Sequence, residues 1–326
     1  MRIVVTGGTG FMGSLLVRDL LKNDYHTVVT VSRRWEGSQA LRNSIPEEHR
    51  RRLRTINADV CDTDELNRIF NGVDIVYHAA AYKSLVDGLY SPFEITRVNI
   101  NGSKSVISAA IENNVKKVVA ISTDKAAEPS NLYGCTKAVM EHMFISANYM
   151  GKTNFAVARY GNVFGSTGSV IPVWKQSFRE NEKITINNPD ATRFWFHPSS
   201  AVSFLRFVME KSVGGEIHIP SLRSSTIAEL AEQFLIYKGV SRNAFRDYII
   251  HSRMNSGEKL HESMISVQEA RNMHLRYTQR GIVLSPLLQR SGDDPDEPAS
   301  IYAAYSSNGS KRCKADELQR MFHDVE

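Results

Sequence analysis

An acid, an amine and a phenol lie within fifteen residues near the middle of the chain. Thr123, Asp124 and Lys125 follow an apolar run, and Tyr133 and Lys137 come shortly after them. Residues four apart share one face of a helix, so the Lys137 ammonium could approach the Tyr133 phenol and lower its pKa. Such a tyrosine can take a proton from a sugar or alcohol hydroxyl while hydride leaves the same carbon. The same spacing also occurs on solvated surface helices. The rest of the chain must therefore show whether Tyr133 and Lys137 belong to a catalytic site.

The start of the chain has the pattern of a dinucleotide-binding turn. A β-branched run at residues 2–6 predicts a buried strand, and apolar residues at helical spacing follow in residues 14–21. Glycines between them allow a tight turn, close approach of the backbone to a pyrophosphate, and phosphates at the helix N-terminus. The residues expected to bind cofactor here are Gly7, Thr9, Gly10, Phe11, Met12 and Gly13.

The end of the second expected strand, residues 27–31, indicates which dinucleotide is bound. A free ribose 2′-hydroxyl usually meets an acidic residue at this point, whereas a 2′-phosphate needs hydroxyl and arginine donors. The chain has Ser32, Arg33 and Arg34 here. These donors predict NADP, with solvated loop arginines as the alternative.

Composition limits the class of protein. The 326 residues are 42% hydrophobic, which is enough for a full core in one integrated unit or two lobes. No run approaches the roughly 20 apolar residues that span a bilayer, and no signal-peptide pattern precedes the first strand, so we expect a cytoplasmic protein without membrane insertion. Cys61, Cys135 and Cys313 have neither disulfide-framework nor metal-ligand spacing. The net charge of +5 suits anionic ligands, but no interleaved aromatics support nucleic-acid binding.

Strand and helix patterns alternate through the first half of the chain, which predicts a parallel sheet with helices on both faces. The expected helices lie at 63–70, 99–113 and from Tyr133 onward, and the expected strands at 75–78, up to Ser122, and at 155–160. Asp59 and Val60 should meet the adenine edge, and Ala79, Ala80 and Ala81 leave room for cofactor. Residues 161–172 suit a substrate-facing loop. A strand at 215–220, a helix at 226–238 and a surface loop at 291–310 complete the prediction.

Several motifs occur in an order that resembles the extended short-chain dehydrogenase/reductase superfamily over nearly the whole chain. Within it, the chain resembles the inverting UDP-N-acetylglucosamine 4,6-dehydratases of polysaccharide biosynthesis. The motifs are Ser122-Thr123-Asp124-Lys125-Ala126-Ala127, Asn131-Leu132-Tyr133-Gly134, Arg159-Tyr160-Gly161-Asn162-Val163, Gly168-Ser169-Val170-Ile171-Pro172, Thr192-Arg193-Phe194-Trp195 and Gly257-Glu258-Lys259-Leu260-His261-Glu262. Lys125 is the feature that points to the inverting group, because retaining relatives usually have glutamate there.

The resemblance implies a Rossmann-type doubly wound α/β fold with a smaller C-terminal α/β substrate lobe. The NADP-binding domain would be residues 1–160 with a returning segment near 194–222, and the substrate lobe residues 161–193 and 223–326. It also implies a homo-oligomer. In the implied mechanism Tyr133, assisted by Lys137, takes the C4 hydroxyl proton, neutral Lys125 removes the C5 proton, and protonated Asp124 releases the C6 hydroxyl as water. Thr123 belongs to the same catalytic group.

Substrate-binding positions also follow from the resemblance. They are Lys83, Asn162, Val170, Pro172, Arg193, Arg253, Glu258 and Lys259. Amide and cationic donors among them suit diphosphate oxygens, and Glu258 could accept from ribose hydroxyls. The family commonly has arginine where this chain has Asn255. Without that arginine, the resemblance implies UDP-N-acetylglucosamine less firmly as the substrate, unless Arg253 takes its place. The alternatives are a 4-epimerase, a dehydratase for another nucleotide-linked sugar, or a non-catalytic NADP-sensing protein.

Overall fold

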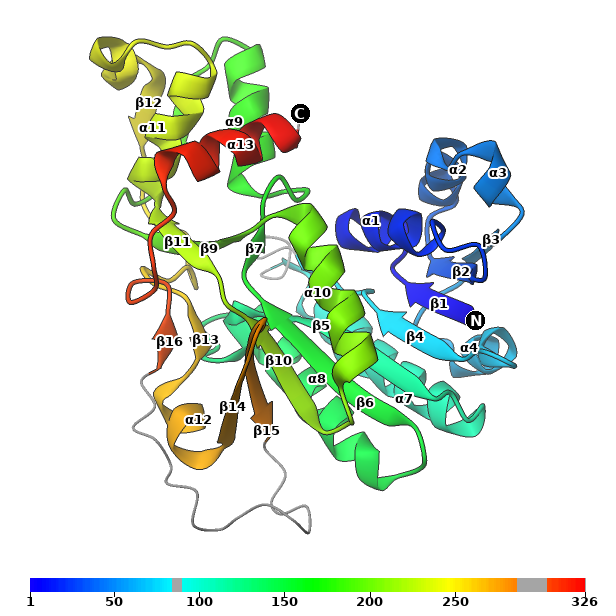
Figure 1. Ribbon diagram of the computed structural model, residues 1–326. Helices are drawn as coiled ribbons and strands as arrows, with labels where there is room; N and C mark the ends of the chain where they lie inside the picture. Colours follow the sequence, from blue (N-terminus) through cyan, green and yellow to red (C-terminus); the bar gives the residue numbers. More distant parts are fainter. Residues whose placement is uncertain (84–89, 286–303, 326) are drawn as a thin grey trace.

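Two hydrophobic cores organise the computed structural model, which describes residues 1–83, 90–285 and 304–325 (Figure 1). The larger core surrounds a nine-stranded sheet with the order β14-β15-β10-β6-β5-β4-β1-β2-β3. Its first seven strands in chain order are parallel, and they are rich in buried valine, isoleucine and alanine, as expected for strands covered on both faces. They are β1 (Arg2–Thr6), β2 (Thr27–Ser32), β3 (Leu53–Asn57), β4 (Ile75–His78), β5 (Lys117–Thr123), β6 (Asn154–Tyr160) and β10 (Glu216–Pro220).

Helices cover both faces of this sheet (Figure 1). On one face α1 (Phe11–Leu20) packs against α10 (Pro198–Lys211), and on the other face α7 (Gly102–Glu112) packs between α4 (Thr63–Phe70) and α8 (Leu132–Ser146). The remaining helical segments of this half are α2 (Trp35–Ser44), α3 (Glu47–Arg50), α6 (Pro92–Thr96), a π-helical turn (Arg97–Asn101) and two 3-10 turns (Asp124–Ala126 and Ala147–Tyr149). The doubly wound α/β fold expected from the sequence is confirmed.

The smaller core lies in the second lobe, where α9 (Val170–Arg179), α11 (Ile227–Tyr237) and α13 (Ala315–Asp324) meet around Trp174, Phe234 and Phe322. Short strands connect this lobe to the main sheet. One small sheet has the order β11 (Arg223–Thr226), β9 (Thr192–Phe196), β7 (Asn162–Val163), and two pairs join β8 (Ile184–Ile186) to β12 (Ile249–His251) and β13 (Ser263–Ile265) to β16 (Tyr305–Ser306). A 3-10 segment (Arg242–Tyr248) and α12 (Val267–Asn272) complete the described elements.

The structure differs from the sequence prediction at four places. The segment 161–172 was expected to be loop, but it contains β7 and the start of α9. Residues 274–285, expected in the substrate lobe, form the antiparallel strands β14 (His274–Thr278) and β15 (Gly281–Ser285), which extend the main sheet beyond β10. The helix expected from residue 99 begins as a π-helical turn at Arg97. Most of the surface loop expected at 291–310 lies outside the described residues, and its described end includes β16.

Within residues 1–83, 90–285 and 304–325, no helix combines the length and apolar character that crossing a bilayer requires.

Candidate active site

A short turn at the carboxyl end of β5 carries the acid and the amine. Thr123 ends the strand, and its hydroxyl accepts a hydrogen bond from the Lys125 amide at 3.4 Å, which caps the 3-10 turn Asp124–Ala126. The carboxyl ends of parallel strands form the edge where α/β proteins bind ligands. The turn therefore presents two successive ionisable side chains at the edge where a ligand is expected.

The phenol comes from the first turn of α8. Asn131 caps this helix by accepting from the Gly134 amide at 2.9 Å, and Tyr133 is the second residue of the helix after the cap. A Cβ at Gly134 would collide with the Lys125 carbonyl group, so a residue without a side chain is needed there. Gly134 thus lets the start of α8 pack against the turn after β5 and brings Tyr133 beside Thr123, Asp124 and Lys125, whose hydroxyl and charges act on its phenol.

Two carboxylates hold the Lys125 amine. Its Nζ lies 3.1 Å from Asp124 Oδ1 and 3.1 Å from Glu262 Oε1. The side chains of Asp124 and Glu262 are almost fully buried, while 18% of the Lys125 side chain is exposed. Burial opposes the charged amine, but Asp124 and Glu262 outweigh it and raise the pKa of Lys125. The neighbours of Lys125 therefore favour the ammonium in this structure, so the neutral amine expected for the elimination step requires the loss of a proton from Lys125.

The two carboxyl groups differ in their affinity for a proton. Burial raises the pKa of Asp124, and the nearby Glu262 charge adds to this effect. Burial acts in the same direction on Glu262, but the charges of Lys125 and Arg193 overcome it and hold the pKa of Glu262 below its usual value. Glu262 is therefore the persistent counter-ion of Lys125, and Asp124 is the carboxyl group that takes a proton first.

Some buried polar atoms of this cluster form no hydrogen bond within the described part of the chain. Among the described residues, Asp124 Oδ2, Glu262 Oε2 and the Tyr160 hydroxyl have no hydrogen-bond partner. Buried polar atoms are almost always satisfied in folded proteins, and groups that are not satisfied often mark functional sites. These atoms belong to the turn after β5, the end of β6 and the segment before β13, which suits a polyhydroxylated ligand at the sheet edge.

Lys137 does not act on Tyr133 as the helical spacing suggested. Its Nζ donates to the Ile121 carbonyl at 2.6 Å and contacts Met140 Sδ at 2.8 Å. Burial lowers the pKa of Lys137 to about 8, although the Glu141 charge opposes the shift. Burial also raises the pKa of Tyr133 to about 12, in spite of the Lys125 charge and a hydrogen bond with Thr123. The expected lowering of the Tyr133 pKa is thus wrong for the ligand-free molecule, because burial dominates.

A cavity of about 710 Å³ lies at the ends of β1, β2 and β4 and contains most of the positions expected to bind cofactor. Gly7 has a φ of +68°, and a Cβ there would lie 2.7 Å from the Ala80 Cα, so the turn fits only glycine. A Cβ at Gly13 would strike the Gly7 carbonyl. The cavity is lined by Gly7, Thr9, Gly10, Val31, Ser32, Arg33, Arg34, Ala58, Val60, Ala79, Ala80, Ala81, Tyr82 and Val98.

The cavity fits a dinucleotide. Gly10 is the N-cap of α1 and offers no side-chain cap, so the first amides of the helix point to where a phosphate could bind. Phe11 and Met12 lie in the first turn of that helix, which begins three residues earlier than expected, and Met12 packs against the larger core. Phe11, Met12, Gly13 and Asp59 are not among the residues that line the cavity.

Ion pairs cross the rim of this cavity. Arg33 Nη1 lies 2.6 Å from Glu94 Oε1, and Arg97 pairs with both Glu94 at 2.8 Å and Asp59 at 2.9 Å. Asp59, expected to meet an adenine edge, is therefore held by Arg97, which sequence reasoning did not single out. Arg34 is exposed and precedes α2 as its N-cap. Of the two arginines, Arg34 is the more accessible to a 2′-phosphate, while Arg33 has an anionic competitor.

The predicted substrate residues fall into two groups. Arg193 is buried and donates to Glu258 Oε1 at 3.1 Å and to the Lys259 carbonyl at 2.8 Å, which fixes the segment after Gly257 beside β9. Lys259 Nζ lies 3.7 Å from Glu128 Oε2, and Arg253 is exposed. Arg193 and Glu258 therefore pair with each other. Their side chains do not face open space that a diphosphate could occupy.

The second group surrounds the start of α9. Asn162 lies in β7, and the half-buried Val170 and Pro172 belong to the first turn of α9. Lys83 Nζ donates to the Thr167 carbonyl at 2.7 Å, so this lysine reaches the loop before α9. These positions lie on segments that follow β4 and β6, which end at the same sheet edge as β5.

Glu262 is the residue of the cluster that sequence reasoning left without a role. It belongs to the same motif as Glu258 and Lys259, and that membership was the only signal available. The distance along the chain to Lys125 gave no sign that the two side chains would meet. The structure brings them together because the segment 260–262 lies alongside β9. The Thr192 amide donates to the Leu260 carbonyl at 2.9 Å and holds the segment there.

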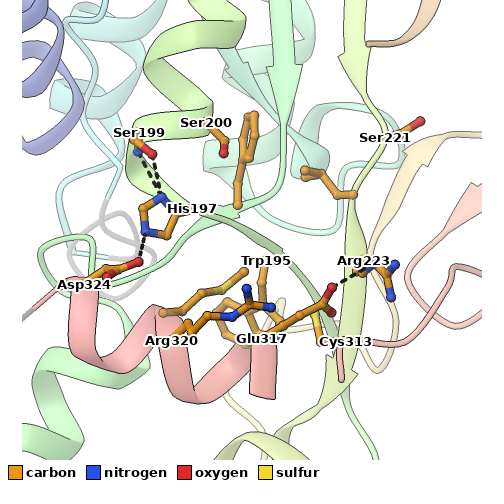
Figure 2. A pocket seen from close by; sticks show the side chains of 13 residues that line it. Trp195, His197, Ser199, Ser200, Ser221, Arg223, Cys313, Glu317, Arg320 and Asp324 are labelled. Carbon is orange, nitrogen blue, oxygen red and sulfur yellow. Dashed lines mark hydrogen bonds and ion pairs between the residues drawn. The ribbon is translucent and has the colours of Figure 1, made fainter. Parts of the chain in front are cut away.

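A second cavity, of about 540 Å³, separates α13 from the start of α10 and shares no residue with the catalytic cluster (Figure 2). His197 joins its walls, with Nε2 at 3.2 Å from Asp324 Oδ2 and Nδ1 at 2.8 Å from Ser199 Oγ. The grouping resembles a hydrolytic triad only in residue type. His197 Nδ1 also accepts from the Ser199 amide at 3.3 Å, as the N-cap of α10. The histidine thus serves helix capping and lobe packing.

Comparison with known proteins gives matches over most of the chain. The family model described as polysaccharide biosynthesis protein matches residues 3–280. An inverting UDP-N-acetylglucosamine 4,6-dehydratase of Campylobacter jejuni is 36% identical over 299 residues, which are 90% of this chain and 85% of that protein. A UDP-glucose 4-epimerase of Rickettsia typhi is 34% identical over 274 residues, or 82% and 78% of the two chains. The X-ray structure of Pen from Bacillus thuringiensis superposes with a TM-score of 0.88 at 27% identity and covers 99% of this chain and 97% of that one.

Proposed function

The chain belongs to the polysaccharide biosynthesis protein family, and on that premise we propose that it is an NADP-dependent nucleotide-sugar 4,6-dehydratase that inverts C5. Its substrate would be UDP-N-acetylglucosamine and its product a 4-keto-6-deoxy sugar nucleotide. The observation that carries the proposal is the Lys125 amine held between two carboxylates next to Tyr133. A base in this position is needed to remove the C5 proton, and simple epimerisation at C4 does not require one.

The first step is oxidation at C4. Tyr133 takes the proton of the C4 hydroxyl as the C4–H bond breaks. The phenolate is the form of Tyr133 that can accept this proton; the Lys125 charge and the Thr123 hydroxyl favour it, against the burial that raises the pKa of Tyr133 to about 12. A bound nicotinamide dinucleotide would take up a hydride from C4 and return it at C6, so it is not consumed. Gly7, Gly10, Ser32 and Arg34 would hold that group, since they line the cavity described above.

The second step is elimination, and it needs a neutral amine and a protonated carboxyl group. The ion pair of Asp124 and Lys125 already contains the required number of protons. Transfer of one proton along the 3.1 Å contact from Lys125 Nζ to Asp124 Oδ1 converts the ion pair into an amine base and a carboxylic acid. Burial of Asp124 favours this transfer, because it penalises the carboxylate.

With the pair in its neutral form, each group has a defined task. Lys125 takes the proton from C5, which the new 4-ketone has acidified, and the electron pair of the C–H bond moves into the enolate. Asp124 gives its proton to the C6 hydroxyl, which leaves as water. A proton from solvent then adds to the opposite face of C5, which inverts that centre, and Tyr133 releases to solvent the proton that it took from the C4 hydroxyl. The protein side chains are restored and the sugar has lost one water.

A 4-epimerase is the second candidate, supported by the similarity to the Rickettsia typhi enzyme. The loss of the usual family arginine at Asn255 also leaves room for another nucleotide-linked sugar. A non-catalytic NADP-sensing protein is less well supported, because such a protein does not need Asp124, Lys125 and Tyr133 together at the sheet edge.

Mass spectrometry of products from a panel of UDP- and dTDP-linked sugars tests the proposal. Loss of one water from UDP-N-acetylglucosamine supports the dehydratase. A product of unchanged mass but altered sugar configuration supports the epimerase. Unchanged substrate across the panel, with NADP still bound, supports the sensing protein.

A further inference from the structure

Glu262 is fixed and buried beside the catalytic turn. Its side chain is 3% exposed. Its backbone amide donates to Ser307 Oγ at 2.9 Å, and its carbonyl accepts from the Ser307 amide at 2.8 Å, so the main chain cannot shift easily. Oε1 contacts Lys125 Nζ at 3.1 Å, while Oε2 has no hydrogen-bond partner among the described residues. The carboxylate therefore has one fixed contact and one free oxygen.

Charge balance alone does not explain this carboxylate. Asp124 and Lys125 already form a neutral pair, and a buried carboxylate carries a desolvation cost that must be offset by partners. Arg193 Nε lies 3.9 Å from Glu262 Oε1, beyond hydrogen-bond distance, and its guanidinium is bonded to Glu258 and to main-chain carbonyls. Lys125 is therefore the one close partner that Glu262 has among the described cations.

We propose that Glu262 is a positioning residue that orients the Lys125 amine toward C5 and stabilises the ammonium formed when the C5 proton is taken. The inference rests on the proposed function and names the residue that the C5 step additionally needs. As the C5–H bond breaks, an N–H bond forms on Lys125 and a positive charge develops there. At this moment Asp124 must be a neutral acid, ready to protonate the leaving hydroxyl. Of the carboxyl groups in the described part of the chain, Glu262 is then the one ionised carboxylate in contact with the new ammonium.

The groups around Lys125 support this division of roles. The charged groups that act on the amine are Asp124 from its own turn, Glu262 from the segment before β13 and Arg193 from β9, and Tyr133 lies close on α8. Of the carboxyl groups, Asp124 has a raised pKa and Glu262 a lowered one. Glu262 thus remains ionised under conditions in which Asp124 is protonated, as a persistent counter-charge must.

The test is the Glu262→Gln variant, which keeps the shape of the side chain and removes its charge. In deuterated water, C5 of the product should acquire deuterium on the order of 10²-fold more slowly than in the wild type, as when one preorganised electrostatic partner is removed. KM should change little. The rate of the initial oxidation at C4, measured as the absorbance of reduced nicotinamide in a single turnover, should also change little. The acidic limb of the pH profile for C5 exchange should move to lower pH, because Glu262 raises the pKa of both Asp124 and Lys125.

Two further variants separate charge from structure. Glu262→Asp keeps the charge and should retain the wild-type pH profile with a partial loss of rate. If the glutamine variant does not fold, Glu262→Asp replaces it as the test variant. Glu216→Gln is the matched control, because Glu216 is a buried carboxylate on β10, paired with His218 and Arg276. It should leave the pH profile of C5 exchange unchanged.

The inference and the proposed function fail in distinguishable ways. Absence of C5 exchange in the wild type would refute the proposed function and the role of Glu262 with it. Normal exchange in the wild type, together with an unaltered rate and pH profile in Glu262→Gln, would overturn the inference alone. If only Glu262→Asp folds, a shifted pH profile in that variant would also overturn it, since the charge is retained.

Discussion

Lys125 follows Asp124 directly in the chain, yet its amine turns back to lie 3.1 Å from the Asp124 carboxylate. Neighbouring residues in an extended strand point to opposite faces, so this contact requires the 3-10 turn that follows β5. The turn makes an acid and a base from one pair of residues that share a proton. Under the proposed function, a single proton transfer inside the pair would convert the ion pair into the acid and the base of the elimination.

Gly134 should be essential for this arrangement. Replacement of a helical glycine by alanine usually stabilises a helix by up to about 1 kcal/mol. In Gly134→Ala the new Cβ would strike the Lys125 carbonyl group, so the start of α8 must move away from the catalytic turn. We expect the variant to lose most of its activity while NADP still binds. Activity measured beside fluorescence titration of the cofactor checks this, and full activity would show that the close contact is not required.

The rim of the cofactor cavity should control affinity for a 2′-phosphate. Glu94 competes for Arg33, and both side chains are partly exposed, so their pairing is worth only a modest free energy. In Glu94→Gln the freed arginine should tighten NADP binding by about 2- to 5-fold without changing NAD binding. Arg33→Ala and Arg34→Ala should weaken NADP binding. Isothermal titration with both dinucleotides measures these changes, and equal wild-type affinity for NADP and NAD would contradict the NADP assignment.

Turnover should not accumulate reduced cofactor, because the hydride removed from C4 is returned at C6. Catalytic amounts of NADP should therefore suffice for complete conversion. Absorbance of reduced nicotinamide in the near ultraviolet, followed throughout the reaction, provides the measurement. A stoichiometric and persistent rise would mark an ordinary dehydrogenase instead.

Stability should depend strongly on one buried cation. Arg159 is 1% exposed and bonds Glu141 on α8 and Glu269 on α12, which ties the sheet to the second lobe. In Arg159→Met both carboxylates lose their partner inside the protein, and the free energy of unfolding should fall by about 3–5 kcal/mol. Arg68→Ala, which breaks an exposed pair with Glu65, should lower the free energy of unfolding far less. Urea unfolding of the two variants makes the comparison; equal losses would contradict it.

The sequence allowed the sheet, the glycine turn and most residues of the cavity beside that turn to be predicted, because these follow from local patterns such as the valine-rich run before Gly7. The links between distant segments could not be predicted in this way. Glu262 reaches Lys125 through the bridge between Thr192 and His261 and the main-chain bonds with Ser307, and Arg97 reaches Asp59 through the π-helical turn before α7. The protonation states were also missed, since the pKa of Tyr133 depends on burial and not on its spacing from Lys137.

The most direct test of the central claim is solvent-deuterium incorporation at C5 in Lys125→Ala, compared with Tyr133→Phe. Loss of a general base typically costs about 10²–10⁴ in rate, far more than loss of an exposed ion pair. Lys125→Ala should bind UDP-N-acetylglucosamine and oxidise C4 but incorporate no deuterium at C5, whereas Tyr133→Phe should stop before any ketone forms. Undiminished dehydration and C5 exchange in Lys125→Ala would contradict the assignment of Lys125 as the base.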